Sequence, residues 1–116
     1  MQNKALIDLY GRLQKVNHFY QQMMFENEQI KIIVHSEFVI DIKNNQFFDL
    51  YLNNIFYYNI DEQDIYDMIV DLLSGEYVFC LIETRKRTQI KVVQKDMFQD
   101  SHKILKAWTV EGVLKV

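Results

Sequence analysis

The sequence contains no proline, three glycines and a single cysteine. One cysteine excludes an internal disulfide and a structural zinc site built from several cysteines, and it is typical of a reducing compartment. Gly11, Gly75 and Gly112 are too far apart to form a glycine-rich phosphate-binding loop. A nucleophile elbow and a zincin helix are missing too. These absences leave catalysis without positive support, and we expect a protein that is not an enzyme and that holds no metal or cofactor.

Long hydrophobic segments are also missing. The longest unbroken apolar run is residues 77–82, whereas a membrane-spanning helix needs about 20 such residues. The N-terminus, MQNKALIDLYGR, lacks the apolar core of a signal peptide. We therefore expect a cytoplasmic protein without membrane contact. Its many Ile, Asn, Lys and Tyr residues are typical of AT-rich bacterial or phage coding.

The composition is that of an ordinary globular protein, with 49% apolar and 25% charged residues among 116. This length favours a single domain, residues 1–116, that builds its own core.

The net charge of −3 conceals an acidic block followed by a basic one. Residues 61–83 hold seven acids and no base, whereas residues 85–116 hold eight bases and three acids. Such blocks can pair within one chain, pair between two copies, or form separate patches.

The most fully signalled helix covers residues 61–75. Asp61 and Asp64 have the spacing of a capping box, and Ile60 and Ile65 that of a hydrophobic staple. Apolar residues then recur at helical spacing up to Gly75, which can adopt the left-handed conformation that ends a helix. A second amphipathic helix is predicted over residues 3–24, although Gly11 costs it about 1 kcal/mol. That helix either covers a sheet or binds a partner.

Between the two helices, the apolar residues alternate with a period of two from Gln29 onward. This pattern, with a two-residue turn at Asn44-Asn45 and another at Asn53-Asn54, predicts three or four antiparallel strands up to Tyr58. Residues 77–82 and 88–94 predict a further hairpin. For residues 97–108 we expect a short helix, although a final strand pair in residues 103–116 is the alternative.

The predicted fold class is therefore α+β, in which the meander and the C-terminal hairpin form an antiparallel sheet packed by the long N-terminal helix and the central helix. In layout alone this order is similar to that of small acidic secretion chaperones, which act as homodimers. It would equally suit an inhibitor of a phage or toxin system. Layout does not fix function.

The residue types that carry chemistry are scattered. His18, His35 and His102 lie in three different elements without the spacing of metal ligands. Cys80 lies inside an apolar strand, as expected of a buried small hydrophobe. Asp64, Asp67 and Asp71 share one face of the central helix, which we interpret as solvated.

Two groups of residues are candidates for binding. The first is aromatic, because six aromatic residues fall between positions 47 and 58 and must point to both faces of the meander. One face can pack under the helices, which would leave four candidates for partner binding: Phe47, Tyr51, Phe56 and Tyr58. The third helix or the chain terminus could instead cover them.

The second group is basic. Five cations lie in and beside the C-terminal hairpin, where they could follow a phosphate backbone: Arg85, Lys86, Arg87, Lys91 and Lys95. The acidic net charge argues against a dedicated nucleic-acid binder.

Our leading hypothesis is a non-catalytic protein-binding module, such as an adaptor, a chaperone-like protein or an inhibitor. It would form a homodimer or bind another protein through the aromatic face. The alternative is a nucleic-acid-binding protein that uses residues 85–95.

Overall fold

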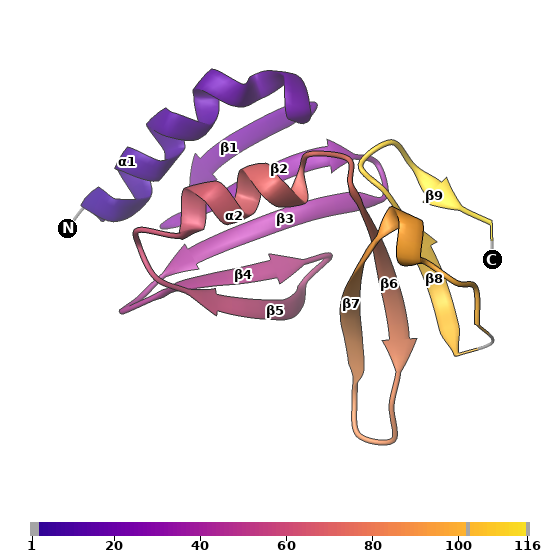
Figure 1. Ribbon diagram of the computed structural model, residues 1–116. Helices are drawn as coiled ribbons and strands as arrows, with labels where there is room; N and C mark the ends of the chain where they lie inside the picture. Colours follow the sequence, from indigo (N-terminus) through magenta and orange to yellow (C-terminus); the bar gives the residue numbers. More distant parts are fainter. Residues whose placement is uncertain (1–2, 102, 116) are drawn as a thin grey trace.

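The computed structural model describes residues 3–101 and 103–115, and in these ranges the chain forms two antiparallel sheets and two α-helices (Figure 1). The elements follow in the order α1 (Lys4–Leu13), η1 (Gln14–Phe19), β1 (Gln22–Glu26), β2 (Gln29–His35), β3 (Phe38–Asn44), β4 (Phe48–Leu52), β5 (Ile55–Ile60), α2 (Ile65–Leu72), β6 (Tyr77–Glu83), β7 (Thr88–Gln94), η2 (Lys95–Met97), β8 (Ile104–Trp108) and β9 (Val113–Leu114). The predicted α+β class is confirmed, but the meander and the C-terminal hairpin belong to different sheets.

The first sheet is a five-stranded meander in the order β1-β2-β3-β4-β5. Its turns are tight because asparagine tolerates positive φ: Asn53 and Asn54 have φ angles of 51° and 65°. The same conformation at Asn27 and Glu28 joins β1 to β2. Each strand therefore pairs with its sequence neighbour, and no long connection is needed in this sheet.

Both helices cover the same face of the meander (Figure 1). Leu6, Leu9 and Leu13 of α1 recur at helical spacing and are buried, as are Ile65 and Ile69 of α2. They pack against the alternate residues of β2, β3 and β4 that point inward: Ile30, Ile32, Ile40, Ile42, Leu50 and Leu52. The helix stripe of period 3.6 and the strand alternation of period two together build this core.

The second sheet has the order β7-β6-β8-β9 and packs its inner face against the same core. Three aromatic rings join the two sheets: Phe38 from β3, Phe79 from β6 and Trp108 from β8. The ring of Phe38 lies 4.5 Å from that of Phe79 and 5.9 Å from that of Trp108. All three side chains are fully buried, so this cluster is the centre of the contact between the sheets.

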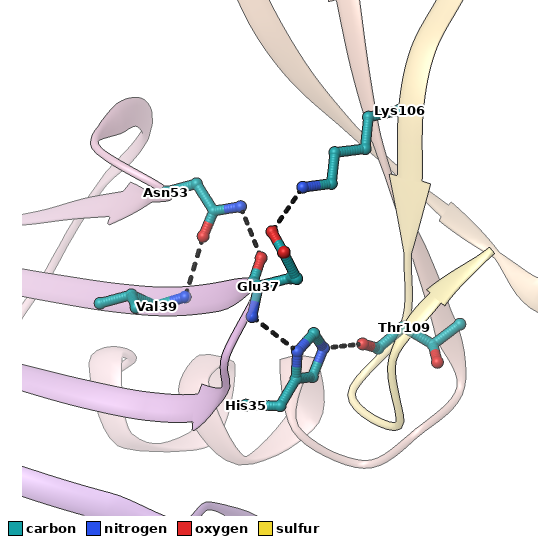
Figure 2. A network of polar contacts seen from close by, with 6 residues as sticks. All are labelled: His35, Glu37, Val39, Asn53, Lys106 and Thr109. Carbon is teal, nitrogen blue, oxygen red and sulfur yellow. Dashed lines mark hydrogen bonds and ion pairs between the residues drawn. The ribbon is translucent and has the colours of Figure 1, made fainter. Parts of the chain in front are cut away.

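Polar contacts reinforce this junction (Figure 2). The amide of Glu37 donates to Nδ1 of His35, so Nε2 carries the proton that His35 donates to the carbonyl of Thr109 at 2.8 Å. The carboxylate of Glu37 pairs with Lys106 of β8 at 2.6 Å, which lowers the pKa of Glu37. Asn53 binds the backbone of both Glu37 and Val39. The β2–β3 turn is thereby fixed to the strand on the other sheet.

Two predicted helices differ from the structure. The N-terminal helix was expected to run through residue 24, but α1 ends at Leu13 and η1 at Phe19. Residues 22–26 pair with β2 instead, because Met23 and Phe25 can face the core while Gln22 and Glu26 face solvent. The helix predicted over residues 97–108 is wrong, and the alternative strand pair is right, since Ile104–Trp108 forms β8.

Smaller features of the prediction also need correction. The central helix begins at Ile65 after Asp64, without a side-chain cap, because residues 61–64 form a turn in which the carbonyl of Asp61 accepts from Asp64 and Ile65. Gly75 has the expected positive φ, 91°, but it lies three residues beyond the last helical residue. The β3–β4 connection spans residues 45–47 and is not a two-residue turn.

Candidate functional site

The outer face of the five-stranded sheet, opposite the helices, is the leading candidate surface. Strand register aligns one outward residue from every strand in a single row across it: Met24, Lys31, Asp41, Tyr51 and Phe56. The described chain has two groups of packed, buried apolar residues, a large one between the helices and the sheets and a small one on the outer face of the second sheet. None of these five side chains is part of either group. We call this row and its outward neighbours Ile33, Val39, Lys43 and Asp49 the open face.

Two of the predicted aromatic residues meet on the open face. The rings of Tyr51 and Phe56 lie 5.5 Å apart in an edge-to-face arrangement, the geometry that aromatic pairs favour. The ammonium of Lys43 lies 5.0 Å from the ring centre of Tyr51. Tyr51 is half-buried by these neighbours, whereas Phe56 remains 51% exposed. Phe56 is thus a large apolar side chain on a sheet face that no other element in residues 3–101 and 103–115 covers.

The other two predicted aromatic residues lie apart from this pair. Phe47 is 46% exposed in the β3–β4 connection, where it shares a shallow surface depression with Asp49 and Asn59. Tyr58 is exposed next to Tyr57 on the edge strand β5, where a register shift disturbs the alternation. The structure therefore brings Tyr51 and Phe56 together, and it leaves Phe47 and Tyr58 at the margins.

Asp41 is a residue of the open face that sequence reasoning did not single out. It stands at the centre of the row, it is only 5% exposed, and its Oδ1 has no hydrogen-bond partner among the described residues. Burial raises the pKa of this carboxyl, while Lys31 and Lys43 partly oppose the rise. A single aspartate in an alternating strand looks like an ordinary solvent-facing residue, so the sequence carried no signal for its burial.

The five candidate basic residues do not share one surface. Arg85, Lys86 and Arg87 are exposed at the tip of the β6–β7 hairpin, which projects away from the rest of the molecule (Figure 1). Lys91 lies on the outer face of the second sheet, opposite Cys80. Lys95 lines a depression with acidic neighbours that include Asp71, Glu76 and Asp96. Only the three cations at the hairpin tip form a cluster without an acid among them.

The remaining candidates have structural partners or stay exposed. Cys80 is buried, and burial raises the pKa of its thiol, which disfavours the nucleophilic thiolate. Tyr77 donates to Asp71 at 2.7 Å, and this bond raises the pKa of the tyrosine. Asp67 is exposed on α2, and Asp64 is exposed in the turn before it.

Of the histidines, His18 is exposed and His35 holds the sheet junction, whereas His102 lies outside the described residues. Within residues 3–101 and 103–115, no three His, Cys, Asp or Glu side chains converge to hold a metal ion.

No helix in the described part of the chain is long and apolar enough to cross a membrane. The chain matches no protein-family model, no curated protein and no solved structure.

Proposed function

We propose that this chain is a small, non-catalytic protein-binding module that self-associates through the open face of its five-stranded sheet. The observation that carries the proposal is that α1 and α2 both cover the inner face, while Phe56 stands half-exposed on the other. Large apolar side chains on an uncovered sheet face are typical of a surface that binds protein.

The distribution of charge on the open face favours a second copy as the partner. Lys31 and Lys43 alternate with Asp41 and Asp49 across neighbouring strands. A face of one sign would repel its own copy, whereas a face that mixes both signs can pair with itself about a twofold axis. This alternation therefore supports a homodimer.

Asp41 adds an energetic argument for association. A buried carboxylate oxygen without a donor destabilises the free chain. In a dimer formed about a twofold axis near this row, a lysine of the second copy could approach Asp41 and supply that donor. The apolar rim of Tyr51 and Phe56 would exclude water from the new pair, as the surround of an interface hot spot does.

Sedimentation of two matched serine variants tests the proposal. Phe56→Ser removes a 51% exposed side chain from the open face, and Leu105→Ser removes a 54% exposed one from β8 of the other sheet. We expect Phe56→Ser to weaken dimerisation tenfold or more, roughly the loss of a hot-spot residue. Leu105→Ser should leave it within about twofold of the wild type. Equal effects of the two variants, with unchanged circular dichroism, would contradict the proposal.

A second function, nucleic-acid binding, is supported only by the three exposed cations at the tip of the β6–β7 hairpin. Filter binding at 50 and 200 mM salt, concentrations chosen about fourfold apart, tests it. If the three cations each contact a phosphate, affinity should fall about 40-fold between these conditions. The double variant Arg85→Ala/Arg87→Ala should then abolish most of this salt dependence. Absence of binding at the lower salt concentration ends this alternative.

A further inference from the structure

The connection between β7 and β8 creates a cavity on the second sheet that is separate from the open face. Both strands are antiparallel to β6 and lie on either side of it, so the chain must cross β6 to pass from one to the other. This crossover, residues 95–101 and 103 of the described chain, connects the end of β7 to the start of β8 (Figure 1). Phe98 packs against the outer cluster of Val78, Cys80 and Ala107, which places the crossover over the outer face of the sheet.

The space between the crossover and the sheet measures about 330 Å³. That volume lies at the lower end of the range of small-molecule sites. Its floor consists of outward side chains of the sheet, among them Cys80, Ile82 and Val93, and Phe98 contributes to its roof. These side chains make the interior apolar, so an occupant must bring an apolar part.

The charged side chains that line this cavity have one sign. Lys91 and Lys103 line it, and no aspartate or glutamate among the described residues does. Lys91 is the cross-strand partner of Cys80 and lines the same cavity, so it lies beside the floor. Two cations beside an apolar floor are complementary to a ligand that joins an apolar chain to an anionic group.

We propose that this crossover cavity binds a small amphipathic anion, such as a medium-chain carboxylate. The apolar chain lies between Phe98 and the floor, and the carboxylate lies at the rim, between Lys91 and Lys103. The site is independent of self-association, because the open face belongs to the other sheet and shares no residue with the cavity.

Titration with sodium octanoate, followed through the methyl resonances of Ile82, Val93 and Ile104 by NMR, tests the proposal. These three residues line the cavity, and Ile33 and Val39 of the open face serve as internal controls. We expect saturable shifts at the cavity methyls only. Butyrate should bind much more weakly, because each buried methylene contributes about fourfold in affinity. Octylammonium, which has the same chain and the opposite charge, should produce no saturable shift.

Two double variants distinguish the effect of the rim lysines on octanoate binding from the effect of the protein's net charge. Lys91→Gln/Lys103→Gln is expected to weaken octanoate binding about fivefold to tenfold, in line with two solvent-screened ion pairs. Lys4→Gln/Lys15→Gln removes the same charge from exposed positions that do not line the cavity and should change binding less than twofold. Equal loss in both variants, equal response to octylammonium, or no saturable binding at millimolar octanoate would each overturn the proposal.

Discussion

The outer faces of the two sheets differ in how they are covered. On the second sheet, the β7–β8 crossover lies over the outer face and packs Phe98 against the cluster of Val78, Cys80 and Ala107. On the five-stranded sheet, no other element of the described chain packs on the outer face, and Phe56 stays half-exposed. The two sheets share one inner core, so the difference arises outside that core.

Strand topology explains this difference. A meander joins each strand to its neighbour by a tight turn, so no connection passes over β1–β5. Two strands that lie parallel on either side of a third require a crossover, and this crossover covers one face of the sheet. A meander with helices on one side therefore leaves its other side uncovered by its own connections, whereas the second sheet covers its outer face with its own chain.

The largest expected effect comes from breaking the core that the two sheets share. Phe38→Ala removes a fully buried ring that contacts both Phe79 and Trp108. We expect the free energy of unfolding to fall by about 3–5 kcal/mol, measured by urea denaturation. Phe47→Ala, at a 46% exposed position, should cost less than about 0.5 kcal/mol. Similar losses for the two variants would contradict the assignment of Phe38 to a joint core.

A second comparison tests the covered face against the open one. Phe98 is half-buried under the crossover, so Phe98→Ala should cost about 1–2 kcal/mol, part of the penalty for a fully buried ring. Phe56→Ala should cost less than about 0.5 kcal/mol at a dilution where the chain is monomeric. If Phe56→Ala proves as costly as Phe98→Ala in the monomer, the open face is packed and the contrast fails.

Asp41 provides a pH-dependent test of the open face. Its pKa is raised in the folded chain above the ordinary value of 3.8, so the folded state holds this proton more tightly than the unfolded state does. Ionised Asp41 therefore lowers the stability of the folded chain. This loss begins as pH rises above 3.8, grows as pH passes through the raised pKa, and is complete above that pKa.

Asp41→Asn should then stabilise the monomer by about 1 kcal/mol at neutral pH, with the gain vanishing near pH 3. Denaturation of both proteins across this range gives the difference directly. Asp49→Asn removes the same charge from a half-buried position on the same face, and it should gain less than half as much. A gain for Asp41→Asn that is independent of pH would show that burial of the charge is not its cause.

The smallest expected effect concerns the helical cover of the inner face. A Cβ at Gly11 of α1 would meet no atom within 4 Å, so Gly11→Ala should stabilise the chain by about 0.5–1 kcal/mol. At Gly75, where φ is 91°, alanine should instead cost about 1 kcal/mol or more. Thermal unfolding of both variants measures whether each substitution raises or lowers stability. A loss of stability in Gly11→Ala would contradict the open space around Gly11.

The elements that sequence reasoning predicted correctly are those whose pattern is local. Alternation predicted the strands between residues 29 and 58, and the apolar run with its charged turn predicted the β6–β7 hairpin. Where the apolar residues of a segment fit both the helical and the strand period, pairing with a distant strand determines which structure forms. Met23 and Met24 fit a helical stripe, but pairing of residues 22–26 with β2 satisfies their backbone in a strand. Trp108 likewise fits a short helix until β6 supplies its pairing partner.

The candidate surface was predicted in part for the same reason. Tyr51 and Phe56 were both candidates, but the sequence left open which of Phe56 and Tyr58 shares a face with Tyr51, and the strand register places Phe56 there. Asp41 became visible only through the register of three strands, because its burial depends on side chains from β2 and β4. The crossover cavity depends on the strand order β7-β6-β8, which no local pattern encodes.

Light scattering behind size exclusion, on the wild-type protein across a concentration series, tests the central claim most directly. If the open face binds a second copy, the mass should rise with concentration toward twice the 14.1 kDa of one chain. Phe56→Ser should shift that transition to higher concentration, and Leu105→Ser should not. A wild-type mass that stays at one chain throughout the series would contradict self-association through the open face.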